Sequence, residues 1–196
     1  MYTVRQALQL FQRAFGKFTP KEKSWKLGER FVDPFRPNIE PDGFASEAEV
    51  LQEQARHLEK VREIFLKANV MVFTLGLTEG WRSKKDGAIY PQAPGVNGGE
   101  FNEKLYEPVN FGAADVIRDL NEFIAKARRK NPTLKFLLTV SPVPLIATHE
   151  NRHVLLSTVY SKSVLRVAAA EAEKANPGFV EYFPSYEIIT SNHNKG

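Results

Sequence analysis

Three apolar-rich runs of strand length, each separated from the next by one helical pattern, constrain the fold of this chain most strongly. They cover residues 70–75, 134–140 and 179–183. The first run is apolar at nearly every position, which is typical of a parallel strand with both faces buried. Strands joined through single helices form parallel β-α-β units with right-handed crossovers. The sequence therefore predicts an α/β fold, a three-layer α/β/α sandwich with a parallel sheet.

Apolar residues at helical spacing predict the helices around these strands. One helix follows Thr3 and ends at Gly16, and a longer one follows Ser46, which forms a capping box with Glu49. Two further helices are predicted near residues 113–130 and 160–175. The segments 17–45 and 76–112 are rich in glycine and proline, so we expect an extended connection and a long loop there, and no closing helix after the third strand. The 196 residues suit one domain.

Composition excludes several classes of protein. The chain has no cysteine and no HExxH pattern, so we expect no disulfide, no cysteine nucleophile, no metal site and no cofactor. The net charge of +4 comes from the first 30 residues. The sequence shows no stripe of basic and aromatic residues of the kind that forms a nucleic-acid interface, so no nucleic-acid partner is expected. No apolar run approaches the roughly 18 residues of a membrane helix, and the N-terminus has no signal-peptide core, which favours a cytoplasmic location without a membrane partner.

Polar residues follow each predicted strand, where ligands bind in open parallel sheets. The three segments are Gly76 to Trp81, Ser141 to Pro144, and Pro184 to Glu187, and we expect them to converge at one edge. Ser141 lacks a GxSxG elbow, and no acid has a motif position beside His149 or His153, so a serine triad is only weakly indicated.

Two other ligand patterns are weak or absent. No GxGxxG or Walker motif is present, which disfavours a nucleotide site. Ser161 and Lys162 open the predicted fourth helix, where their amides and the ammonium could hold an anion. A capping serine beside a solvated lysine is the favoured interpretation, because such caps are common.

Four motifs in this chain resemble the GSCFA family, a bacterial group similar to the SGNH/GDSL hydrolases. They are Thr74 to Glu79 with Trp81, Leu138 to Leu145, Tyr160 to Arg166, and Tyr182 to Ile188. The resemblance covers nearly the whole chain and implies an SGNH-like fold and hydrolysis of ester or acyl bonds through a nucleophilic serine. It also implies a small-molecule or glycan ester as the substrate.

The resemblance also implies roles for individual residues. The third SGNH block reads Gly-x-Asn-Asp, and Gly76, Thr78 and Glu79 occupy its first, third and fourth places. Gly76 and Thr78 are therefore expected at an oxyanion hole. The expected substrate-binding residues are Glu79, Trp81, Ser141, His149 and Tyr186.

The motif that names the family, Gly-Ser-Cys-Phe-Ala, is absent here, and so is the late Asp-x-x-His block of SGNH hydrolases. We therefore expect a partial GSCFA-like domain over residues 1–196, with its nucleophile and catalytic histidine outside the chain and no esterase turnover by the chain alone. A non-catalytic binding or interaction module on the same fold is the alternative. We further expect self-association through the sheet edge formed by residues 70–75.

Overall fold

The computed structural model describes residues 3–191 and divides into two compact units. The first unit contains the residues up to Leu8, Phe65–Glu79, and the chain from Asn110 onward. The second unit contains Gln9–Ile64 and Gly80–Val109. Two helices, α1 (Val4–Ala14) and α2 (Glu47–Lys67), contribute residues to both units.

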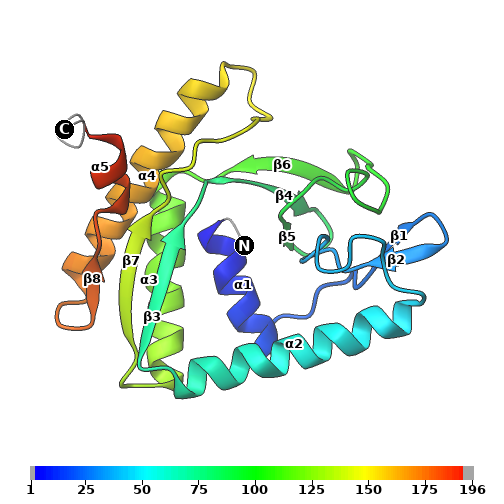
Figure 1. Cartoon of the computed structure of the whole chain (residues 1–196), viewed down its shortest axis with the longest axis horizontal. Helices are drawn as coiled ribbons and strands as arrows, with labels where there is room; N and C mark the ends of the chain where they lie inside the picture. The colour runs from blue at the N-terminus through cyan, green and yellow to red at the C-terminus, as the bar shows by residue number, and fades with distance from the viewer. Residues whose placement is uncertain (1–2, 192–196) are drawn as a thin grey trace. The chain divides into compact units, whose positions relative to one another are not determined.

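A parallel three-stranded sheet forms the centre of the first unit (Figure 1). Its order is β3-β7-β8, with bounds Val70–Leu75, Lys135–Val140 and Val180–Tyr182. Val70 pairs with Lys135, and Phe136 pairs with Val180, in parallel register. The α/β fold with a parallel sheet and the adjacency of the three predicted strands are thus confirmed.

Two long helices pack on one face of this sheet. They are α3 (Ala113–Lys130) and α4 (Val154–Ala175), which also contact each other. Phe123 of α3 lies at the centre of the packing, with its ring 5.6 Å from that of Phe73 and 6.0 Å from that of Phe136. A short helix, α5 (Ser185–Thr190), follows β8 where no helix was expected.

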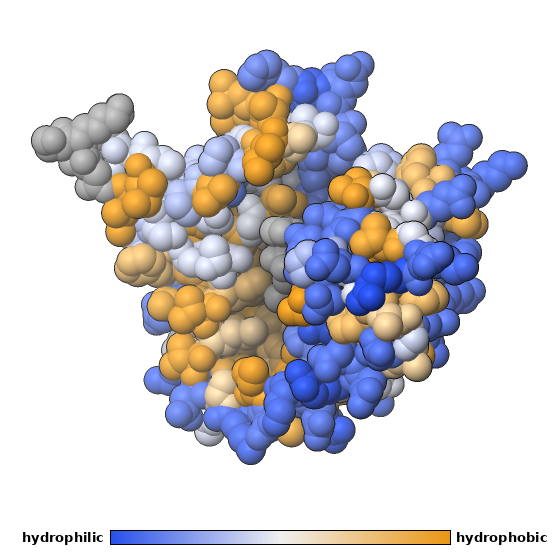
Figure 2. Space-filling view, turned by 45° about the vertical axis from the view of Figure 1, so that its right-hand side comes forward, coloured by the Kyte–Doolittle hydropathy of each residue, from blue (hydrophilic) through white to orange (hydrophobic). Residues whose placement is uncertain are grey.

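The first strand differs from its prediction, because it is buried on one face only. Phe73 and Leu75 are buried and face the same side as Phe123, whereas Val70 and Val72 are 54% and 64% exposed. Figure 2 shows hydrophobic side chains gathered over part of the surface, and the exposed hydrophobic residues of the chain include Val70 and Val72 of this strand. The expectation of two buried faces was wrong for β3, because right-handed crossovers in the order β3-β7-β8 place α3 and α4 on the same side of the sheet.

The second unit contains strands in both segments that were expected to be loops. β1 (Trp25–Leu27) and β2 (Arg30–Val32) form an antiparallel hairpin. A second sheet has the order β5-β4-β6, with bounds Ile89–Tyr90, Glu79–Ser83 and Tyr106–Asn110. These strands are too short to show a clear alternation of apolar and polar residues. Pro108 in β6 also argued against a strand, although proline is tolerated on an edge strand such as this one.

A buried aromatic cluster and a capped helix hold the second unit together. The cluster contains Trp25, Val32, Ala88, Tyr90 and Tyr106. At the start of α2, the Ser46 hydroxyl accepts the Glu49 N–H at 3.2 Å, and the Glu49 carboxylate accepts the Ala45 N–H at 3.0 Å. The predicted Ser46 cap is therefore confirmed, and Glu49 reaches back as expected, although its carboxylate binds the N–H of Ala45 and not that of the cap residue. No helix within residues 3–191 is long and apolar enough to cross a membrane.

Candidate functional site

The segments that follow the three parallel strands meet at the carboxyl edge of the sheet. The Ser141 N–H, after β7, donates to the Leu75 carbonyl at the end of β3 over 2.9 Å. The Ser185 hydroxyl, after β8, donates to the Val140 carbonyl over 3.0 Å and also contacts the Thr139 hydroxyl. The predicted convergence is therefore confirmed for Gly76 to Glu79, Ser141 to Pro144 and Pro184 to Glu187, whereas Gly80 and Trp81 belong to the second unit.

Helix α4 begins at Val154, well before the predicted start, with His153 as its N-cap residue. The His153 Nδ1 accepts the Leu155 N–H at 3.2 Å. Ser161 and Lys162 consequently lie inside the helix, where both side chains are buried. The predicted anion site at a helix N-terminus and the alternative, a capping serine beside a solvated lysine, were therefore both wrong.

Lys162 reaches from α4 to the loop after β3. Its ammonium donates to the Gly76 carbonyl at 2.8 Å, and burial lowers its pKa to about 8. Groups whose pKa is shifted by burial cluster at functional sites. The sequence signal was the Tyr160 to Arg166 motif, but residue types alone do not show that its lysine points inward.

Thr78 is also tied into this loop. It is 1% exposed, and its N–H donates to the Ser161 hydroxyl at 3.0 Å. Its own hydroxyl donates to the Asn110 side-chain carbonyl at 2.7 Å. Because both of its donors serve protein acceptors, Thr78 could act at an oxyanion hole only by giving up one of these bonds. Its contacts in this structure hold the loop in place.

Glu79 and His149 form an acid–histidine pair at the same edge. The His149 Nδ1 lies 3.0 Å from a Glu79 carboxylate oxygen, and the His149 backbone N–H lies 3.3 Å from the same oxygen. The other Glu79 oxygen accepts the Thr148 hydroxyl at 2.7 Å. The Glu79 and His149 side chains are only 9% and 17% exposed, so the carboxylate and the imidazole ring are fixed in position.

A second carboxylate extends the network around His149. The His149 Nε2 lies 3.7 Å from Glu150 Oε1, which accepts the Asn110 amide at 3.3 Å. Through Asn110, this network connects to the Thr78 hydroxyl. An imidazole oriented by a carboxylate is the arrangement that general acid–base catalysis uses. The sequence did not indicate this pair, because Glu79 and His149 are 70 positions apart.

The other predicted site residues, Ser141, Tyr186 and Trp81, make contacts of their own outside the network of Glu79 and His149. The Ser141 hydroxyl accepts the Val143 N–H at 3.2 Å and so closes a local turn. Tyr186 lies in α5, where its carbonyl accepts the Thr190 hydroxyl. Trp81 belongs to the second unit, opposite Tyr90 in the β4-β5 pairing. The structure thus brings Gly76, Thr78, Glu79 and His149 to one edge, along with Ser141. Within residues 3–191, no cluster of three or more histidine and acidic side chains is arranged to hold a metal ion.

Together, the sheet and its polar edge define an α/β protein with a candidate acid–histidine site beyond the carboxyl ends of parallel strands. The family model of the GSCFA family matches residues 1–196, and the chain belongs to the GSCFA family. Comparisons with curated proteins and with solved structures found no match.

Proposed function

We propose that this GSCFA protein hydrolyses ester or acyl bonds, with His149 as the general base and Glu79 as the residue that orients it. The contact of 3.0 Å between His149 Nδ1 and Glu79 Oε2 is the observation that supports this proposal most directly. In serine hydrolases, a buried carboxylate binds the Nδ1–H of the histidine, so that Nε2 can take the proton of the attacking hydroxyl. The family's resemblance to SGNH hydrolases supports a small-molecule or glycan ester as the substrate.

The proposed step moves one proton through His149. The imidazole accepts a proton while the attacking oxygen forms its bond to the acyl carbon, and it returns that proton to the alcohol when the ester C–O bond breaks. The 196 residues contain no Gly-Ser dipeptide that would match the SGNH nucleophile block. A water molecule is the simplest attacking group that His149 could activate in this chain.

We therefore expect slow hydrolysis of an activated ester by the chain itself. This differs from the sequence-based expectation of no turnover, because the sequence did not show an acid beside His149. The assay is release of p-nitrophenol from p-nitrophenyl acetate at pH 7.5, with heat-denatured protein as the background. His149→Ala should lose about a hundredfold of the rate above background, the lower range for general-base catalysis. Glu79→Gln should lose less, because the imidazole remains.

His153 offers the matched control for nonspecific imidazole reactivity. It lies four positions after His149 and serves as the cap of α4. His153→Asn keeps a good capping residue and should leave the rate unchanged. A wild-type rate equal to that of denatured protein, or equal losses in His149→Ala and His153→Asn, would overturn the hydrolase proposal.

A non-catalytic binding module is the second candidate function. The engaged donors of Thr78 favour it, because an oxyanion hole needs donors that point at the substrate. In this case, short-chain esters and their acids would perturb the His149 NMR signals without being consumed. Product formation that depends on His149 would reject this candidate.

A further inference from the structure

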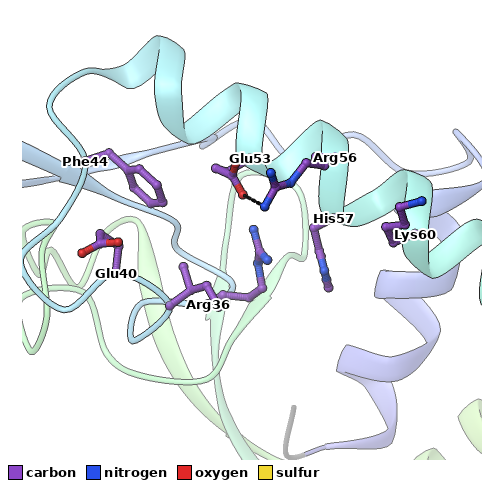
Figure 3. Close-up of a pocket in the computed structure, with 8 residues that line it drawn as sticks. Arg36, Glu40, Phe44, Glu53, Arg56, His57 and Lys60 are labelled. Carbon is purple, nitrogen blue, oxygen red and sulfur yellow. Dashed lines mark ion pairs between the residues drawn. The ribbon is translucent and has the colours of Figure 1, made fainter.

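The second unit contains a pocket lined by three cationic side chains, two carboxylates, a histidine and two apolar residues. It has a volume of about 540 Å³ and lies between α2 and the segment that follows β2. Arg56, His57 and Lys60 line it from α2, and Arg36 lines it from the opposite segment. The side chains of Arg36, Arg56 and His57 gather around the same space (Figure 3). A volume of several hundred Å³ is typical of small-molecule sites.

Beside this pocket, two arginines share one buried carboxylate. Arg36 Nε donates to Asp33 at 2.9 Å, and Asp33 is 2% exposed. Arg13 interacts electrostatically with the same Asp33 and is repelled by Arg36, while burial lowers its pKa to about 10. Two partly buried guanidinium groups near a single carboxylate leave an excess of positive charge, which an anion would compensate.

Two nitrogen atoms of these arginines lack hydrogen-bond partners. Arg36 Nη2 and Arg13 Nε are buried, and neither has an acceptor among the described residues. Buried donors are nearly always satisfied in folded proteins, and those that are not call for an explanation. Arg36 lines the pocket and its side chain is 22% exposed, so an oxyanion in the pocket can approach this side chain and supply the missing negative charge.

The rest of the lining limits the size and charge of such a ligand. Glu53, 3.4 Å from Arg56, and Glu40 place two carboxylates on the lining, which disfavours a polyanion such as nucleic acid. Ile39 and Phe44 provide an apolar wall. We propose that this pocket binds a small organic anion, with its carboxylate or phosphate group on Arg36 and its apolar part against Ile39 and Phe44.

Four probes at constant ionic strength test the proposal by isothermal titration calorimetry on the full chain. Benzoate and phenyl phosphate carry the two head groups on an apolar ring, acetate lacks the ring, and benzamide is the neutral counterpart of benzoate. We expect benzoate or phenyl phosphate to bind more tightly than acetate and benzamide. The preference between the first two identifies the head group.

Three variants connect binding to the pocket. Arg36→Lys keeps the charge beside Asp33 but removes the guanidinium fork, and should weaken binding about tenfold. Lys60→Gln, at an exposed position, should weaken it up to about fivefold without affecting folding. Lys104→Gln removes an exposed lysine of the same unit that does not line the pocket, and should bind like the wild type.

The NMR titration of His57 provides an independent readout. Burial, together with the charges of Arg36 and Arg13, lowers the pKa of His57, while Asp33 opposes them. A bound anion offsets the arginine charges, so benzoate or phenyl phosphate should raise this pKa and benzamide should not. Equal affinities for benzoate and benzamide together with no binding of phenyl phosphate, or wild-type affinity in both Arg36→Lys and Lys60→Gln, would overturn the proposal.

Discussion

The ammonium of Lys162, inside helix α4, donates to the carbonyl of Gly76 in the loop that follows β3, over 2.8 Å. A helix on one face of the sheet therefore holds the loop that precedes Thr78 and Glu79. Lys162 is 2% exposed, and burial alone lowers its pKa to about 8. The site loop thus depends on a group whose charge changes just above neutral pH.

Lys162 should make stability depend on pH in a defined window. Its pKa of about 8 in the folded protein lies below the value of about 10.4 for an unperturbed lysine. Between these values the unfolded chain binds more protons, so this contribution to stability rises with pH. Urea denaturation should show the wild type gaining up to about 1.4 kcal/mol per pH unit relative to Lys162→Met. Lys174→Met, in the exposed last turn of α4, should keep the wild-type slope.

Glu22 should stabilise the second unit through the charge of its carboxylate. It accepts the Tyr106 hydroxyl at 2.6 Å, the Lys85 ammonium at 3.0 Å and the Trp25 indole N–H at 3.1 Å. Burial raises the pKa of Glu22, but these donors together outweigh burial, so the pKa is lowered. Glu22→Gln should cost about 2 kcal/mol at pH 7, within the range for hydrogen bonds to charged groups.

The pH dependence of the Glu22→Gln effect follows from the same shift. A lowered pKa means that the stabilisation is present above the ordinary glutamate value of about 4.3 and is lost as the pH falls. Urea denaturation followed by tryptophan fluorescence at pH 7 and pH 3 measures this loss. Glu29→Gln, at an exposed position of the same unit, is the control. A constant difference between wild type and Glu22→Gln at both pH values would contradict the prediction.

Asp119 should be the most sensitive charged residue of α3. It is 2% exposed and accepts two bonds from the Arg5 guanidinium, at 2.6 and 2.9 Å. Asp119→Asn leaves Arg5 without its counter-charge and should cost about 3 kcal/mol. Asp115→Asn breaks the exposed pair with Arg118 on the same helix and should cost less than about 1 kcal/mol. Chemical denaturation of both variants measures the contrast.

The edge strand β3 supports the proposal that the chain self-associates. Val70 and Val72 are exposed on its open face, and β3 pairs with β7 on one side, with no second neighbour among the described strands. An apolar edge strand of this kind pairs readily with another chain. Size-exclusion chromatography should show concentration-dependent oligomers, and Val72→Lys should shift them toward the monomer. A wild-type monomer at all concentrations, with a cooperative thermal melt, would rule this out.

The parallel sheet was predictable because local patterns specify it. The runs at residues 70–75 and 134–140 are long enough to stand out, and Ser46 with Glu49 gives a capping signal within four residues. The strands of the second unit were not predictable, because segments as short as Ile89–Tyr90 have no measurable period.

The candidate site was predictable only in outline. That three strand ends converge follows from parallel topology, and Glu79 and His149 were named as site residues separately. Their pairing depends on a tertiary contact across 70 positions, which no local pattern records. The inward direction of Lys162 could not be predicted either. The start of α4 at Val154 decides which residues of the helix face the loop, and the sequence placed that start too late.

The contact between Arg5 and Asp119 joins residues 114 positions apart and has a consequence for the order in which the chain acquires structure during synthesis. The second unit ends at Val109, so its residues are all translated before α3 begins at Ala113. The opening turns of α1 belong to the first unit and lack their α3 partner until that helix has been made. Because domains fold as units during translation, the second unit can fold on the ribosome while Arg5 still lacks its partner on α3.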